Sequence, residues 1–139
     1  MTVASRFLEF QTKGNAQAVN VTDDLRSSLA ETGLKNGICT LFVPGSTGGV
    51  TTVEFEPGLL RDLQEAWERL APSGHTYKHD EAWGDGNGHS HIRASLLGAS
   101  LTIPFVDGNF ALGTWQQVIF VDFDNRSRLR RLVLQFLGE

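Results

Sequence analysis

Hydrophobic and polar positions alternate along several short segments of the chain, a pattern that is typical of β-strands. Phe7, Leu8 and Phe10 indicate an opening strand, and Leu132, Leu134 and Phe136 share one face of the last one. Asp107-Gly108 is typical hairpin-turn chemistry. The expected strands are residues 3–12, 37–43, 50–55, 100–106, 109–112, 114–123 and 128–137.

Two longer segments have helical spacing instead. Thr22 is an expected N-cap, Leu25 and Leu29 lie four residues apart, and Gly33 stands where the helix should end. Apolar residues also recur at three- and four-residue steps over 57–70. A shorter helix is possible at 92–97. The fold class expected is α+β, a single domain over residues 1–139 with a layered, mostly antiparallel sheet and two main helices.

Composition narrows the function classes. Twelve basic and 16 acidic residues give a net charge of −4, and no basic block is present to grip nucleic acid or an anionic membrane. No apolar stretch approaches the roughly 18 residues of a membrane span, so we expect a cytoplasmic protein. The single cysteine, Cys39, lies in an apolar run and is expected to be a buried, unreactive thiol.

Three of the four histidines fall within a short polar segment. His79, His89 and His91 accompany Asp85 and Asn87, and imidazoles gathered in this way bind a metal or move protons. Hydrogen-bonded structural histidines are the alternative. On a helix, His89 and His91 would point about 200° apart, so a shared metal requires an extended or loop conformation there.

A glycine- and hydroxyl-rich loop, 45–49, offers backbone N–H groups and the hydroxyls of Ser46 and Thr47. Both suit a phosphate or carboxylate, although the loop lacks the lysine and the following helix of a P-loop. An ordinary tight hairpin is the alternative. Glu54, in the next strand, is either the acid of a site or a solvent-facing residue.

A third polar group surrounds Trp115 and Gln116, which can stack against and hydrogen-bond a flat ring. The alternative is a buried tryptophan beside a satisfied glutamine. The arginines that follow either contact anions or form ordinary surface ion pairs. They are Arg126, Arg128, Arg130 and Arg131.

Taken in order, these short motifs resemble the YjbQ-like family over nearly the whole chain. They are Gly45-Ser-Thr with Thr51 and Glu54, Asp62-Leu63, Tyr77-Lys-His79, Asn87-Gly-His-Ser-His91-Ile-Arg93, Leu97-Gly98, Ile103-Pro104, and Gly113-Thr-Trp-Gln116 with the arginine-rich tail.

The family is named for a secondary thiamine-phosphate synthase activity. The resemblance implies a layered α+β fold and a homotrimer with sites near the subunit interfaces. It also implies that His79, Asn87, His91, Trp115 and Gln116 line the pocket. The catalytic residues that we expect are His79, His91, Asn87 and Glu54. The substrate-binding residues that we expect are Ser46, Thr47, Arg93, Trp115 and Gln116.

One position departs from the family pattern. Many members have a histidine where this chain has Gly45, and its absence removes one ligand or base. We expect His89 to supply the missing imidazole, giving a metal set of His79, His89, His91 and Asp85 for zinc or magnesium.

Three functions follow from these expectations. The first is an enzyme that joins a pyrimidine methyl pyrophosphate to a thiazole phosphate. The second is a histidine-ligated, metal-dependent hydrolase of a small phosphorylated or acylated substrate. The third is a non-catalytic trimeric module that binds a metal or small molecule.

Overall fold

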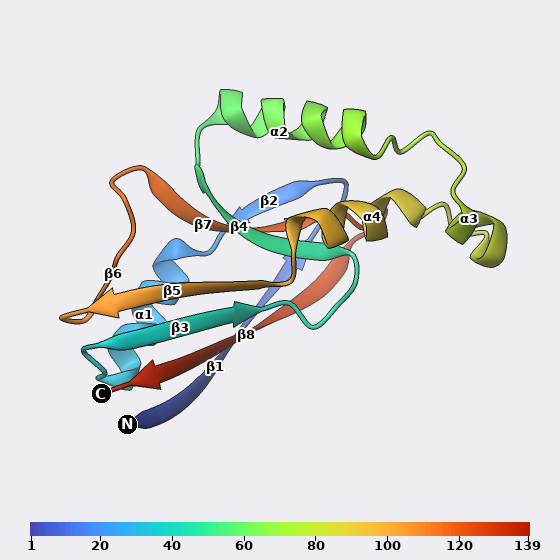
Figure 1. Ribbon diagram of the computed structural model, residues 1–139. Helices are drawn as coiled ribbons and strands as arrows, with labels where there is room; N and C mark the ends of the chain where they lie inside the picture. The colour runs from blue at the N-terminus through green and yellow to red at the C-terminus, as the bar shows by residue number, and fades with distance from the viewer.

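The computed structural model describes residues 1–139, and Figure 1 shows two antiparallel sheets with two helices above them and another helix behind them. The five-stranded sheet has the order β1 (Thr2–Thr12), β8 (Arg128–Gly138), β3 (Gly37–Phe42), β5 (Ser100–Val106) and β6 (Asn109–Phe110). The three-stranded sheet has the order β2 (Gln17–Asn20), β7 (Gln116–Asp122) and β4 (Gly48–Glu54). The helices are α1 (Thr22–Thr32), α2 (Pro57–Leu70), α3 (Lys78–Trp83) and α4 (Gly88–Leu97). The expected layered antiparallel α+β fold is confirmed.

The main core lies between the two sheets. Period-two alternation directs Leu132, Leu134 and Phe136 of β8 inward, where none has exposed surface. They share one hydrophobic cluster with Phe120 of β7 and with Leu25 of α1. Each such side chain contributes roughly 1.5–3 kcal/mol when it is fully buried. The sheets are therefore held together by the side chains that the alternating pattern identified.

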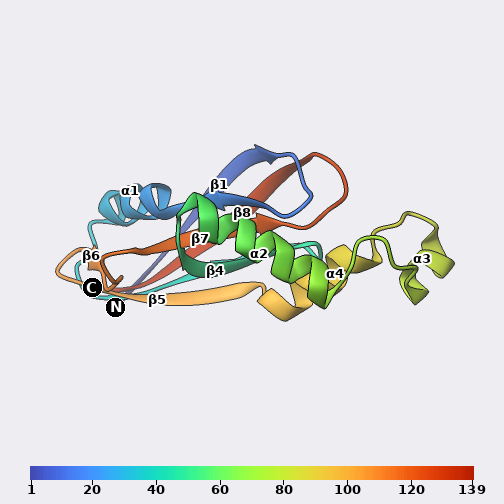
Figure 2. The same ribbon diagram turned by 90° about the horizontal axis from the view of Figure 1, so that it is seen from above.

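A second, smaller cluster lies on the outer face of the three-stranded sheet. Ile119 and Val121 of β7 pack there with Ala94 of α4. The ring of Trp67, from α2, meets that of Phe123 edge to face with 5.0 Å between centroids. Figure 2, seen from above, shows α2 crossing over β4 and β7. Helices α2 and α4 therefore form a third layer on this face, whereas α1 packs against the main core.

The structure differs from the sequence-based prediction at four places. Strand β2 was not anticipated, and α4 begins at Gly88, four residues before the expected start. Thr22 is the first helical residue of α1, and Val21 is the N-cap. Strands β3 and β4 belong to different sheets, so the loop between them is a crossing from one layer to the other and not a hairpin. The Asp107-Gly108 hairpin turn is confirmed, because both residues have positive φ and they join β5 to β6.

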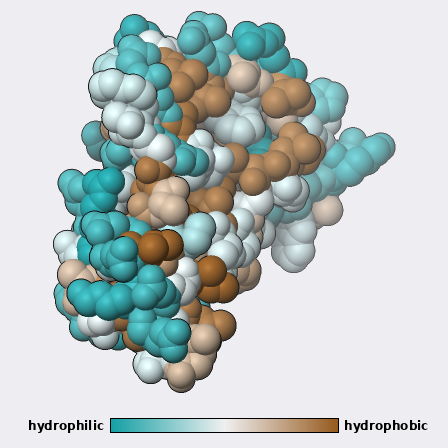
Figure 3. Space-filling view, turned by 60° about the vertical axis from the view of Figure 1, so that its left-hand side comes forward, coloured by the Kyte–Doolittle hydropathy of each residue, from teal (hydrophilic) through white to brown (hydrophobic).

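Helix α2 packs loosely on the layer beneath it. It is amphipathic, yet none of its residues is buried, and Leu70 at its end is 64% exposed. Figure 3 shows apolar surface through the upper half of the molecule, the half that carries α2 in Figure 1. No helix in the chain has both the length and the apolar character needed to cross a membrane.

Candidate functional site

Three crossings between the sheets meet at one corner of the molecule. Residues 13–16 lead from β1 to β2, 43–47 from β3 to β4, and 123–127 from β7 to β8. The Phe123 amide donates to the Thr47 carbonyl at 2.9 Å, and the Asn15 amide donates to the Asp124 carbonyl at 2.8 Å. Gly14 is required here, because it has a φ of +78° and a Cβ would lie 2.4 Å from the Asp124 oxygen. Polar side chains on separate strands are thereby brought together.

Two aspartates with no exposed surface, Asp122 and Asp124, stand at this corner. Arg130 donates from Nε to Oδ2 of Asp122 at 2.7 Å and from Nη2 to Oδ1 at 2.8 Å. Thr12 also donates to Asp122, at 2.5 Å. Arg130 is therefore half of a buried, side-on ion pair, and the expectation of ordinary surface pairs does not describe it.

Asp124 holds the neighbouring arginine. Its Oδ2 accepts hydrogen bonds from Thr47 Oγ1 at 3.0 Å and from Arg128 Nε at 3.0 Å. Burial alone would raise the pKa of Asp124, but the Thr47 hydrogen bond and the charges of Arg128 and Arg130 lower it below its usual value. Asp124 is therefore a stably ionised carboxylate, and it fixes the hydroxyl of Thr47.

A pair of histidines lies beside this corner. His79 of α3 and His91 of α4 have ring centroids 4.4 Å apart and ring planes tilted by 43°. Asp85 lies between the helices, with its Oδ1 3.5 Å from Nδ1 of His79. The chain turns there through two glycines of positive φ, Gly84 and Gly86. The structure thus gathers His79, His91 and Asp85, all three of which were expected in the site.

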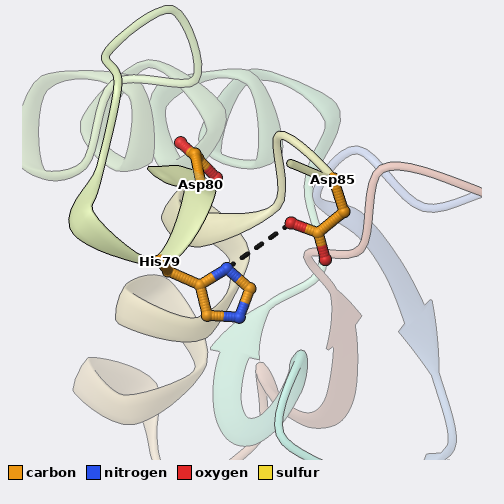
Figure 4. A group of neighbouring side chains, drawn as sticks. All are labelled: His79, Asp80 and Asp85. Atoms are coloured by element: carbon orange, nitrogen blue, oxygen red, sulfur yellow. Dashed lines mark ion pairs between the residues drawn. The ribbon is translucent and has the colours of Figure 1, made fainter. Parts of the chain in front are cut away.

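Asp80 is close to this group, but it has another role. One of its oxygens accepts from the Tyr77 amide and the other from the Gly88 amide, both at 2.9 Å. Figure 4 shows the Asp85 carboxylate directed at the His79 ring and the Asp80 carboxylate turned away. Asp80 therefore fixes the start of α3 to the start of α4 and positions the histidines. The Tyr77-to-Asp80 spacing of a capping box was the signal that could have identified it.

A polar cavity of about 390 Å³ opens where the histidines meet the corner. A smaller hollow of about 200 Å³ continues from it along α4 and shares Gly45, Ser46 and His91. The main cavity is lined by Pro44, Gly45, Ser46, Thr47, Asp85, Asn87, His91, Arg128, Leu129 and Arg130. The glycine- and hydroxyl-rich loop, the histidine segment and the arginine tail therefore surround one space.

His89 is not brought to this cavity. It lies in the first turn of α4, which is helical, so it points away from His91. Its ring is buried, and its Nδ1 has no hydrogen-bond partner. Burial, followed by the nearby charge of Arg93, lowers its pKa. The expectation that His89 replaces the missing family histidine as a shared ligand is thus corrected by the helical geometry.

Arg93 also faces away from the cavity. It is 4% exposed, donates from Nε to the Ala71 carbonyl at 3.0 Å, and pairs with Glu68 at 2.8 Å. These bonds tie α4 to the end of α2. The guanidinium therefore serves the packing of two helices and borders a separate hollow, so a substrate-binding role of Arg93 at this cavity stays a prediction.

Trp115, Gln116 and Glu54 lie at the far end of β4 and β7. Trp115 is 73% exposed and lines, with Glu54, a second cavity of about 450 Å³. Gln116 instead holds its own loop, since it accepts from the Gly113 amide and donates to Thr52 Oγ1, both at 3.0 Å. Six residue steps of about 3.3 Å separate Glu54 from Gly48, so about 20 Å lies between the two ends of β4.

Comparisons with known proteins agree with this architecture. A sequence profile described as UPF0047 protein YjbQ-like matches residues 6–139. A UPF0047 protein of Archaeoglobus fulgidus is 35% identical over 94% of this chain and 98% of its own length. One from Methanothermobacter thermautotrophicus is 33% identical over 100% of this chain and 95% of its own.

Solved structures give the same result. A YbjQ-like protein of unknown function from Sulfolobus solfataricus has a TM-score of 0.89 at 29% identity, covering 99% of this chain and 100% of that one. A hypothetical protein from Aeropyrum pernix has a TM-score of 0.86 at 34% identity, covering 96% of this chain and 99% of that one. The chain therefore belongs to the UPF0047 YjbQ-like family.

Proposed function

We propose that this protein is a metal-dependent enzyme that acts on a small phosphorylated substrate. Hydrolysis of that substrate is the reaction that a single chain supports best. The observation that carries this proposal is that His79 lies beside both His91 and Asp85, and that His91 and Asp85 line one polar cavity. Two imidazoles and one carboxylate form a donor set common in catalytic zinc sites. Magnesium, which prefers oxygen ligands, fits this set less well.

The state of the donor atoms supports a metal. Nδ1 of His79 is buried and makes no hydrogen bond, so it is free to coordinate. Both oxygens of Asp80, by contrast, already accept backbone N–H groups. His79, His91 and Asp85 are therefore the residues that would hold the ion. When bound, such an ion lowers the pKa of water and polarises a phosphoryl oxygen.

Other groups of the cavity would act directly on the substrate. Asn87 is 5% exposed, and its Oδ1 lies 2.5 Å from the hydroxyl of Ser90, which leaves the amide nitrogen to donate to a substrate oxygen. The cavity thus combines a cation site with an orienting amide.

Release of inorganic phosphate tests the proposal. The purified chain should hydrolyse a small phosphate monoester with saturation kinetics when zinc or manganese is supplied. The His91→Ala variant should lose this activity while keeping its circular dichroism spectrum. His75→Ala is the matched control, because His75 is an exposed histidine outside the cavity. Tight metal or ligand binding without turnover in the parent protein would instead favour the non-catalytic module.

The transferase is the second candidate, and the exposed Trp115 beside Glu54 favours it, since an aromatic surface next to an acid can hold a pyrimidine ring. Within one chain that platform is about 20 Å from the histidine cavity, so a neighbouring copy would have to complete the site. Pyrophosphate release from a pyrimidine methyl pyrophosphate and a thiazole phosphate, lost in Trp115→Ala but retained in Trp83→Ala, would establish this reaction.

A homotrimer, which the family resemblance implied, would provide such a neighbour. The amphipathic but unburied helix α2 is consistent with an assembly that covers it. Light scattering should then give three times the mass of one chain. Leu63→Glu, which places a charge on the apolar face of α2, should yield smaller particles, whereas Arg69→Glu, at an exposed position of the same helix, should not.

A further inference from the structure

The polar cavity contains several hydrogen-bond donors that have no acceptor in the chain. We propose that these donors form a binding subsite for the phosphate group of the substrate, and that Gly45 is the residue that opens this subsite. The subsite rests on the proposed function, because the phosphate group would belong to the substrate of the same enzyme.

The first donor is the remaining terminal nitrogen of Arg130. Nε and Nη2 are both engaged with Asp122, and Nη2 also donates to Thr47 at 2.8 Å. Nη1 makes no hydrogen bond, yet it is not among the buried polar atoms that lack a partner. It is therefore in contact with solvent, although only 11% of the side chain is exposed. Because the ion pair already fixes the arginine side chain, Nη1 can bind a ligand with little further loss of side-chain conformational entropy.

Gly45 controls access to this nitrogen. A Cβ built at position 45 would lie 3.4 Å from Nη1 of Arg130 and would touch nothing else within 4 Å. The φ of Gly45 is not in the left-handed region, so its backbone does not require glycine. A longer side chain would cover Nη1 and fill the space in front of it. The glycine thus leaves open a subsite that larger residues would close.

Further donors point to a phosphate. Ser46 is exposed and its hydroxyl has no partner, while Nη1 of Arg128 and the amide nitrogen of Asn87 are also unbonded. All belong to residues that line the same cavity. Thr47 is different, because its hydroxyl hydrogen is donated to Asp124. Donors on separate walls suit three terminal oxygens better than the two oxygens of a carboxylate.

The buried aspartates determine how this subsite works. Asp122 and Asp124 offset the formal charges of Arg130 and Arg128, so the cavity has no large excess of positive charge. Side-on pairing with Asp122 also turns Nη1 toward Gly45. Affinity must therefore come from oriented donors, and a carboxylate placed beside Nη1 would compete with a phosphate for them.

Titration calorimetry with inorganic phosphate tests this directly, using the full chain treated with chelator so that no metal contributes. We expect saturable binding by the parent protein and weaker binding of acetate. Gly45→Glu should weaken phosphate binding about tenfold or more, because its carboxylate occupies Nη1. Gly45→Gln, which adds similar bulk without charge, should weaken it less. Gly74→Glu adds the same charge in an exposed loop with open space around it and should bind phosphate as the parent does.

The outcomes separate the subsite from the catalytic proposal. Phosphate binding by the chelator-treated chain that is weakened in Gly45→Glu and retained in Gly74→Glu would support the subsite even if no turnover is found. Failure of the parent to bind phosphate, equal affinity in Gly45→Glu and parent, or equal binding of acetate and phosphate would overturn it. Gly45 is exposed, and thermal unfolding of each variant checks that a loss of binding is not a loss of folding.

Discussion

The guanidinium of Arg130 is paired side-on with the carboxylate of Asp122, through hydrogen bonds of 2.7 and 2.8 Å, and the carboxylate has no exposed surface. The pair joins the end of β7 in one sheet to β8 in the other. It therefore serves two purposes, because it locks the corner where the sheets cross and it orients the arginine that lines the cavity.

Removing one partner of this pair should be costly. Asp122→Asn leaves the arginine charge without its carboxylate, and we expect the free energy of unfolding to fall by about 3–5 kcal/mol. Urea denaturation measures this loss. The control is Asp23→Asn, which removes a 3.3 Å pair with Arg26 whose aspartate is 98% exposed, and which should cost only about 0–1 kcal/mol. Equal effects of the two variants would contradict a structural role for the buried pair.

Stability should depend on pH through Asp124, whose pKa is lowered in the folded protein. The unfolded chain binds this proton more readily, so the stabilisation is fully present above the unfolded pKa of about 3.9 and is lost as the pH falls through the lower folded pKa. Urea denaturation between pH 6 and the acid limit of folding would show it. In Asp124→Asn this component of the acid-induced loss should be absent, and identical pH profiles would show that the lowered pKa makes no contribution.

The thiol of Cys39 should be unreactive in the native protein. It has no exposed surface, and burial raises its pKa to about 12. At pH 8 a disulfide reagent should label it only as fast as the protein unfolds, whereas labelling in urea should be immediate. Rapid labelling of the native chain would mean that this part of the core opens far more often than its packing suggests.

Two glycines should respond differently to the addition of one methyl group. A Cβ on Gly48 would lie 2.6 Å from the ring of Phe120, which is completely buried and cannot move aside. Gly48→Ala should therefore destabilise the protein by roughly 1–3 kcal/mol. Gly74→Ala meets nothing within 4 Å and should change stability by less than about 0.5 kcal/mol. Thermal unfolding distinguishes them, and equal melting temperatures would disprove the close contact.

Local patterns were enough to predict most of the elements. The strand at 100–106 was expected and found with the same bounds, and the helix that ends at Gly33 closes with the left-handed conformation expected of it. Strand β2 was missed, because four residues carry too little alternation to be recognised. The layer change between β3 and β4 was also missed, since the choice of partner strand depends on contacts remote in sequence.

The candidate site was predicted only in part, because some of its residues are close in sequence and others are brought together by the fold. His79, Asp85 and His91 are close in sequence, and two short helices keep them close in space. The pairing of Arg130 with Asp122 and Thr47 depends on three strands meeting at the corner, which no local pattern reveals. The placement of His89 away from His91 depended on whether its segment was helical, and the sequence left that open.

The metal content of the untagged protein, purified without chelator, tests the proposed metal site most directly. We predict about one divalent ion per chain, bound by His79, Asp85 and His91. The ion should be lost in His91→Ala and retained in His89→Ala, because His89 does not line the cavity. Absence of a stoichiometric metal after reconstitution with zinc, or loss of the metal in His89→Ala alone, would contradict it.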